Sequence, residues 1–313
     1  MRISRLLAII ALALAGVWFA AEPLLVAQAR RHVQADGIAP QPGWGRLGLA
    51  LSGATLPTRA GPLVLPGLGL WVTPLAPTTL RAELPATAFL DAPAGRRQIG
   101  MEDAVAAVTL SPLGAARQAS ASFAALALDG APLSGQGAVT ARRVADDRLS
   151  GHPFQVRIDL PDLRLPQARS ATGGLRLWLD RAPGLATQAP PAVLGVMTEG
   201  LEIDTGGFTV RLAGQLSKGA DGLAQGRVAL YSGDAAAMLD AAIGAGLIPP
   251  NVRLLARAML NRIGQMDFAS GGEEWPVMPP AAQGQVRIPL EMRGGRMYLG
   301  TIEIGAAPAW PVP

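Results

Sequence analysis

The chain has 313 residues, of which 50% are hydrophobic, and its 38 glycines and 27 prolines favour many short strands and turns over a helical bundle. The absence of cysteine excludes disulfides, thiolate metal sites and a cysteine nucleophile. The net charge of +4 comes from scattered arginines, not from the clustered cations that a phosphate backbone requires, so we expect no nucleic-acid partner.

Residues 1–36 are predicted to be a membrane anchor or an export signal. Arg2 and Arg5 precede the uncharged stretch Leu6–Ala21. This stretch is long for the apolar core of a signal peptide and shorter than the roughly 20 residues that span a bilayer. The membrane is therefore an expected partner.

Two interpretations of this segment stay open. In the first, the helix continues past Pro23 to Val26 and remains as an uncleaved anchor. In the second, Pro23 ends the helix, and a peptidase cuts after the small-residue motif Ala27–Ala29. We favour the anchor, because an arginine pair directly after a cleavage site is unusual. The expected location is the bacterial inner membrane with a periplasmic C-terminal region, or the periplasm if the segment is cleaved.

Residues 37–150 are predicted to form an N-terminal β-rich half. Apolar residues alternate with small or polar ones in three runs, and each run ends near a proline, which suits a strand end or edge. The runs are Leu47–Leu51, Leu68–Val72 and Leu80–Leu84, with weaker ones at Val105–Leu110, Ala121–Leu128 and Ala138–Ala141. Met101–Val108 could instead form a helix.

Residues 151–313 are predicted to form a C-terminal β-rich half. Six apolar residues alternate with polar ones in two of its strands, and they are candidates for a sheet face that is either core or an apolar groove. These residues are Phe154, Val156, Ile158, Phe208, Val210 and Leu212. The turn Lys218–Gly222 predicts a hairpin. A slip in the alternation after Leu299 predicts a bulge near Gly300.

A helical hairpin is expected at about residues 233–266. Leu239 and Ile243 have helical spacing, and a second apolar face runs from Val252 to Ile263. The two halves also share a strand–turn–strand design, which suggests an internal duplication. The predicted fold is therefore mainly β, with an N-terminal membrane helix and two related antiparallel halves.

No catalytic, cofactor-binding or metal-binding residue is predicted, and no cofactor is expected. His32 and His152 are too few and too distant for a zinc site, and no nucleophile elbow is present. His152 is interpreted as a turn residue. The adjacent acids Asp146 and Asp147 would point to opposite faces of a strand, which does not suit a catalytic carboxylate pair, and they are interpreted as solvated loop charge.

Four stretches together resemble the bacterial family called domain of unknown function 2125. They are Pro62–Pro85, Gly151–Phe154, Gly233–Gly246 and Met292–Gly300. The resemblance implies an envelope protein of alphaproteobacterial type and carries no activity, cofactor or site residue. An anchored, largely β chain with an open apolar sheet is also loosely similar to AsmA-like envelope proteins that are associated with lipid movement.

The leading functional hypothesis is a non-enzymatic, lipid-binding or lipid-handling envelope module. One alternative is a structural scaffold for envelope protein complexes, which would expose a contiguous apolar patch. Another is a hydrolase whose carboxylates come from separate strands. Possible partners are therefore the membrane, lipid or envelope proteins.

Overall fold

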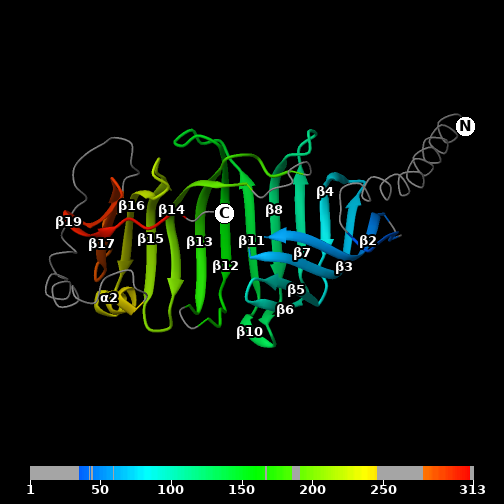
Figure 1. Cartoon of the computed structure of the whole chain (residues 1–313), viewed down its shortest axis with the longest axis horizontal. Helices are drawn as coiled ribbons and strands as arrows, with labels where there is room; N and C mark the ends of the chain where they lie inside the picture. The colour runs from blue at the N-terminus through cyan, green and yellow to red at the C-terminus, as the bar shows by residue number, and fades with distance from the viewer. Residues whose placement is uncertain are drawn as a thin grey trace, which may run out of the picture. The chain divides into compact units, whose positions relative to one another are not determined.

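The computed structural model describes residues 35–310, except for 42, 44, 59, 166–167, 185–190 and 245–277. The described residues form a strand-dominated protein (Figure 1) that divides into two compact units, Met1–Leu133 and Ser134–Pro313. No described helix is both long and apolar enough to cross a membrane. The predicted anchor lies outside the described residues, apart from its last two positions.

The described residues of the first unit form nine antiparallel strands with a branch point. The strands are β1 (Gly37–Pro40), β2 (Leu47–Thr58), β3 (Gly61–Thr73), β4 (Ala76–Glu83), β5 (Thr87–Ala92), β6 (Gly95–Glu102), β7 (Val105–Leu110), β8 (Ala116–Phe123) and β9 (Ala125–Leu128). The first part of β3 pairs with β5 and its last part pairs with β4. One branch therefore continues through β7 to β8, and the other continues through β6 to β9.

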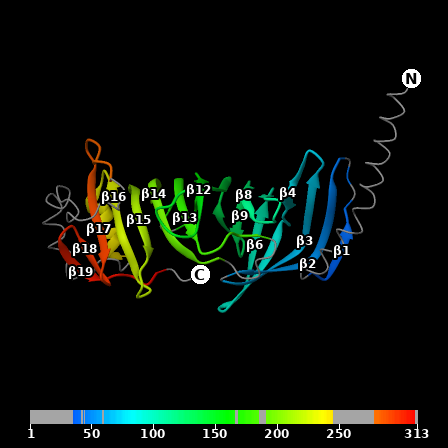
Figure 2. The same ribbon diagram turned by 90° about the horizontal axis from the view of Figure 1, so that it is seen from above.

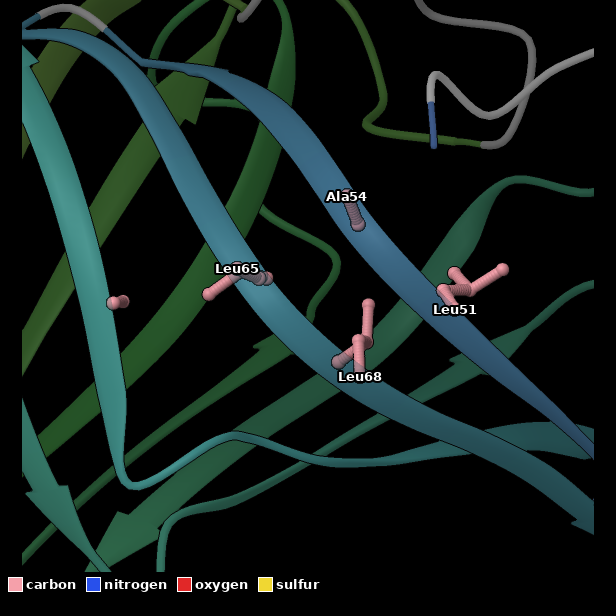
Figure 3. Packing of buried hydrophobic residues seen from close by; sticks show 5 residues of the cluster. Leu51, Ala54, Leu65 and Leu68 are labelled. Carbon is pink, nitrogen blue, oxygen red and sulfur yellow. The ribbon is translucent and has the colours of Figure 1, made fainter. Parts of the chain in front are cut away.

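The core of the first unit is built on β2 and β3 (Figure 3). Leu51 is paired with Leu68 and Ala54 with Leu65, and all four are buried. The inward positions shift by one residue within each strand. In β2 the shift falls at Gly53, whose positive φ of 61° suits glycine. Side chains from both branches pack against this cluster, so the two branches share one core.

Two details of the first unit differ from the sequence-based expectations. Met101–Val108 is not a helix: β6 ends at Glu102, Asp103 takes a positive φ of 48° in the turn, and β7 begins at Val105. The expected run Ala121–Leu128 is interrupted at Ala124, where β8 gives way to β9. The secondary structure of an alanine-rich stretch is ambiguous from sequence, because alanine favours helices by propensity and is also small enough to fit in a strand.

The described strands of the second unit, from β11 to β19, form an antiparallel meander in which each pairs with its successor, as both views show (Figures 1 and 2). Its strands are β11 (Gly137–Arg143), β12 (His152–Leu160), β13 (Ser170–Leu179), β14 (Val193–Asp204), β15 (Thr209–Lys218), β16 (Ala224–Ser232), β17 (Val286–Arg293), β18 (Arg296–Leu299) and β19 (Ile302–Ala306). The short β10 (Ala131–Ser134) crosses the division between the units. The hairpin predicted around Lys218–Gly222 is confirmed as β15–β16.

The helix predicted after Ser232 is α2 (Ala235–Gly244). Asp234 caps it, since its Oδ1 accepts a hydrogen bond from the amide of Ala237 at 2.9 Å. The second helix of the predicted hairpin lies outside the described residues. The bulge predicted near Gly300 occurs instead where β19 pairs with Met297 and Tyr298 of β18.

The predicted halves meet at residue 150, whereas the compact units divide between Leu133 and Ser134. The reason is that β11 pairs along its length with β12 and so belongs to the second unit. This pairing brings the loop between β11 and β12, residues 144–151, into the second unit.

Candidate functional site

All six candidate residues lie on one face of the second unit, which we call the apolar face. Strand pairing aligns this face in rows, because residues paired across antiparallel strands point the same way. Four rows of paired residues define this face. The first is Leu160–Ala171–Ile203–Val210, and the second consists of Ile158–Gly173 and, beyond a register shift between β13 and β14, Leu201–Leu212–Leu230–Ile288. The third is Val156–Leu175–Thr198–Gly214–Val228–Leu290, and the fourth is Phe154–Leu177–Val196–Leu216–Gly226–Met292. These rows contain no charged side chain.

The apolar face is only partly covered. Phe154 and Val156 are buried, at 5% and 9% exposure, while the other four candidate residues are half-buried. Half-buried residues also fill much of the two middle rows, for example Leu175 and Val228. A sheet face of this kind keeps part of its apolar surface accessible, in contrast to a closed core, whose side chains are fully enclosed.

Two described segments pack on this face at opposite ends of the strands. Met238 of α2 packs with Phe208, Val210 and Ile288 near one end. Trp310 packs with Val196, Leu216 and Met292 near the other end, and its Nε1 donates a hydrogen bond to the carbonyl of Val193 at 2.7 Å. In Figure 1, α2 lies at the lower end of β15 and β16, and the red C-terminal stretch crosses these strands higher up.

Glycines in the strand interiors shape the apolar face. Gly214 and Gly226 have φ angles of 146° and 140°, which side-chain-bearing residues rarely adopt. A Cβ atom on Gly214 would lie 2.3 Å from the carbonyl oxygen of Arg227. Such glycines mark bends and close backbone approaches in a sheet. They also leave two rows without a side chain at these positions.

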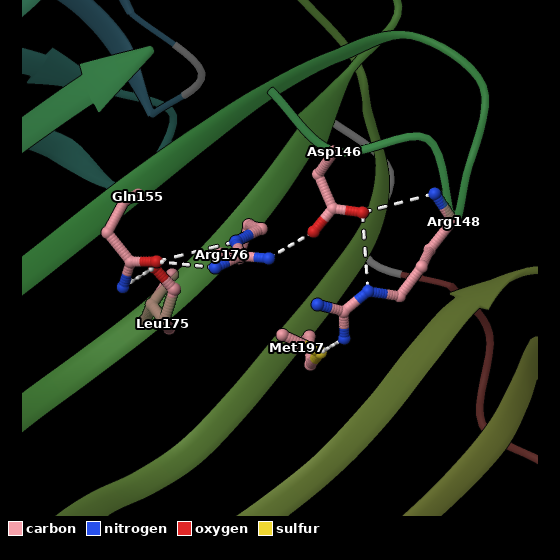
Figure 4. Close-up of polar contacts among 6 residues, drawn as sticks. All are labelled: Asp146, Arg148, Gln155, Leu175, Arg176 and Met197. Carbon is pink, nitrogen blue, oxygen red and sulfur yellow. Dashed lines mark hydrogen bonds and ion pairs between the residues drawn. The ribbon is translucent and has the colours of Figure 1, made fainter. Parts of the chain in front are cut away.

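The opposite face of the same strands is mixed: it buries Trp178, Met197 and Tyr231 and also carries arginine and carboxylate side chains. We call it the polar face, and it holds an ion-pair network (Figure 4). Asp146, in the β11–β12 loop, is 3% exposed and pairs with Arg176 of β13 and with Arg148, whose Nε lies 3.3 Å away. Arg176 also donates to the Oε1 of Gln155 at 3.2 Å, and Arg148 donates to the Sδ of Met197 at 2.9 Å. The network ties the loop to three strands.

The network holds Asp146 as a carboxylate. Removal from water is the largest influence on the pKa of this carboxyl and raises it, but the amide of Arg148 and the guanidinium groups of Arg176 and Arg148 together lower the pKa below its ordinary value. A carboxylate neutralised by two arginines is a poor proton donor at neutral pH, so this arrangement serves to fasten the loop to the sheet.

A second buried ion pair lies on the polar face farther along the sheet. Arg227 of β16 donates to the Oε1 of Glu291 in β17 at 3.1 Å, and the two side chains are 12% and 8% exposed. Gln215 of β15 is paired with Arg227, so the three polar side chains form one row. Among the described residues no group of three or more metal-ligating side chains is present.

A family model described as an uncharacterized protein conserved in bacteria, DUF2125, matches residues 45–308. The chain belongs to the DUF2125 family. This confirms the family resemblance of the sequence, which covers nearly all of the described DUF2125 fold. No curated protein and no solved structure matches the chain. The similarity to AsmA-like proteins therefore has no support in these comparisons.

The residues singled out from the sequence can now be located in the DUF2125 chain. The six apolar candidates do share one face. In contrast, Asp146, interpreted from the sequence as solvated, is buried and paired, because the pairing of β11 with β12 folds its loop over Arg176. The one available signal was Arg176 itself, an arginine on the polar side of a strong strand. His152 begins β12, and its Nδ1 lies 3.3 Å from the Nη2 of Arg143.

Proposed function

We propose that this DUF2125 chain is a non-enzymatic envelope module that shelters acyl chains of lipids on its apolar face. The observation that carries the proposal is the run of charge-free, half-buried rows from β12 to β17. An acyl chain needs a continuous apolar surface and no hydrogen-bond partner, and these rows offer that surface.

The arrangement around the face supports a bound apolar ligand. α2 and the stretch at Trp310 pack at opposite ends of the strands, and half-buried apolar side chains lie in the rows between them. Ligand sites of this chemistry are predominantly apolar and have few polar groups. Thr198 is the sole polar side chain in the four rows as described, and its Oγ1 donates to the carbonyl of Gly174 at 2.8 Å, within the sheet.

The proposal includes location. The segment of residues 1–36 would hold the chain in the inner membrane and place the two units in the periplasm, where they could take up lipid from the adjacent bilayer. The related design of the two halves and the second helix of the hairpin also remain proposals.

The described carboxyl groups whose pKa is clearly shifted are poorly suited to donate a proton in hydrolysis. Three carboxyl groups have a lowered pKa: Asp129 mainly through a hydrogen bond from the amide of Gln98, Asp146 as described above, and Asp180 mainly through Arg181. A carboxylic acid that donates a proton in hydrolysis needs a raised pKa. These three groups are instead held ionised.

Adjacent residues on opposite faces of β12 give a matched test. Ile158 is half-buried on the apolar face and Arg157 is exposed on the polar face. The full chain and its Ile158→Glu and Arg157→Glu variants are incubated with phospholipid vesicles, separated from them, and extracted for mass spectrometry. Circular dichroism checks that each variant is folded.

We expect the wild type and Arg157→Glu to carry the same amount of phospholipid. Ile158→Glu should carry at least about tenfold less, which corresponds to about 1.4 kcal/mol, because a carboxylate on the apolar face must be desolvated beside an acyl chain. Equal lipid in the two folded variants, or none in any protein, would show that the face is an ordinary core.

A further inference from the structure

Two leucines of the first unit project into solvent at hairpin turns. Leu75, between β3 and β4, is 98% exposed, and Leu113, between β7 and β8, is 96% exposed. The other exposed large apolar residues among those described, such as Leu56 at 41% and Val105 at 44%, keep more than half of their surface covered. Near-complete exposure of a leucine is unfavourable in water unless another surface covers it.

Strand pairing brings the two leucines to neighbouring positions. β4 pairs antiparallel with β7, and Thr79 opposite Thr109 is the pair nearest to the two turns. The hydroxyl oxygens of these threonines lie 3.0 Å apart. The β3–β4 turn precedes Thr79 and the β7–β8 turn follows Thr109, so both turns lie at the same end of adjacent strands. We call this end the leucine tips.

Both turns hold their leucine outward by the same means. Each has proline directly before the leucine, Pro74 and Pro112, and proline fixes one backbone angle of the turn. In the second turn the amide of Gly114 also donates to the carbonyl of Ser111 at 2.9 Å. The leucines are thus presented by constrained turns.

The charge near the leucine tips is positive. The stretches 71–80 and 107–118 contain no aspartate or glutamate, and they contain the exposed Arg117. Arg46, beside the first residue of β2, lies with its guanidinium carbon 5.5 Å from the ring centroid of Trp71. Arginine and tryptophan are residues that favour the headgroup region of a bilayer.

We propose that the leucine tips dock on the surface of a membrane that contains anionic lipid. Leu75 and Leu113 enter the boundary between headgroups and acyl chains, while Arg46 and Arg117 face lipid phosphates. Two protruding apolar side chains surrounded by cations can insert into an anionic bilayer, whose lipids rearrange around them. A folded protein partner would instead be expected to bind a broad apolar patch. The proposal concerns the first unit and does not rest on lipid binding by the second.

The absence of native cysteine makes single-cysteine labelling a clean test. Three variants of the full chain, Leu75→Cys, Leu113→Cys and Ala94→Cys, each carry one environment-sensitive nitrobenzoxadiazole dye. Ala94 is a matched control: it is exposed and follows Pro93 in the β5–β6 turn. That turn lies at the other end of β3, because Leu90 of β5 pairs with Leu63, near the start of β3.

The labelled chains are measured before and after association with vesicles of phosphatidylethanolamine and phosphatidylglycerol that contain a quencher in the acyl region. We expect dyes at positions 75 and 113 to shift to shorter wavelength and to lose most of their emission, and the dye at position 94 to keep its aqueous spectrum. Dyes at 75 and 113 that stay as aqueous as the control would overturn the proposal. Dyes that are shielded before vesicles are added would overturn it in favour of a protein partner or a second copy.

Discussion

Replacement of Asp146 by asparagine should weaken the second unit, because it removes the charge at the centre of the network on the polar face. Asp146 is 3% exposed and its partner Arg176 is 20% exposed, so both are largely removed from water. Loss of one member of a buried pair costs about 3 kcal/mol. The side chain of Arg148 is 42% exposed, so its ion pair with Asp146 contributes little to stability. The side-chain oxygen of the asparagine can still accept the hydrogen bond from the backbone amide of Arg148.

We therefore expect Asp146→Asn to lower the free energy of unfolding by about 2–3 kcal/mol, which lowers the urea midpoint by about 1 M at a typical m value. Hydrogen exchange read by mass spectrometry on β13 peptides across a urea series follows this unit alone. Asp162→Asn is the matched control, since Asp162 and Arg164 are each 54% exposed, and it should change stability by less than about 0.5 kcal/mol.

The effect should also depend on pH in a defined direction. Because the pKa of Asp146 is lowered in the folded chain, the wild-type advantage is fully present above the unfolded pKa of about 3.9. It disappears as the pH falls through the folded pKa, where wild type and variant converge. A difference between Asp146→Asn and wild type that stayed constant into the acid range, or that matched the Asp162→Asn control, would refute this role for the network.

Three further substitutions probe the second unit: Gly214 and Trp310 belong to the apolar face and its cover, whereas Tyr231 lies on the opposite face. Gly214→Ala should lower the free energy of unfolding by about 2 kcal/mol, because the φ of this residue is 146° and the new Cβ would lie 2.3 Å from a carbonyl oxygen. The control Gly207→Ala has open space around the new Cβ, so its free energy of unfolding should be nearly unchanged in the same urea titration. Trp310→Phe should lower the free energy of unfolding by about 1 kcal/mol, because the 2.7 Å hydrogen bond from the indole to a carbonyl of β14 is lost. Faster hydrogen exchange in β14 peptides measures this loss. Tyr231→Phe should cost about 1 kcal/mol through loss of the 2.6 Å bond to a carbonyl of residue 279. Burial raises the pKa of Tyr231, so the wild-type advantage over that variant should persist below pH about 10 and fade as the pH rises through the folded pKa.

Local periodicity predicted the parts of the fold that depend on neighbours in sequence. The alternation at Phe154–Ile158 and at Phe208–Leu212 identified β12, β15 and the face that they share, because side-chain direction in a strand has a strict period of two. The branch at β3 could not be predicted, because a strand that pairs with two partners on one edge has no special local pattern.

The polar network and the leucine tips were missed for a related reason. The ion pair between Asp146 and Arg176 depends on a loop crossing over β13, and the adjacency of Leu75 and Leu113 depends on the pairing of β4 with β7. Neither sequence distance nor composition encodes those pairings. Two Pro-Leu turns stand in the sequence, but a turn leucine is conspicuous only when its exposure is known.

The most direct test of the central claim places a photo-crosslinking amino acid on each face of β14 in turn. Leu201 is half-buried on the apolar face, and the next residue, Glu202, is exposed on the polar face. We predict that benzoylphenylalanine at position 201 of the membrane-associated full chain captures phospholipid, detected as an adduct by mass spectrometry, and that at position 202 it does not. Capture at neither position, with crosslinks at 201 only to other parts of the chain, would contradict the claim that the apolar face binds lipid.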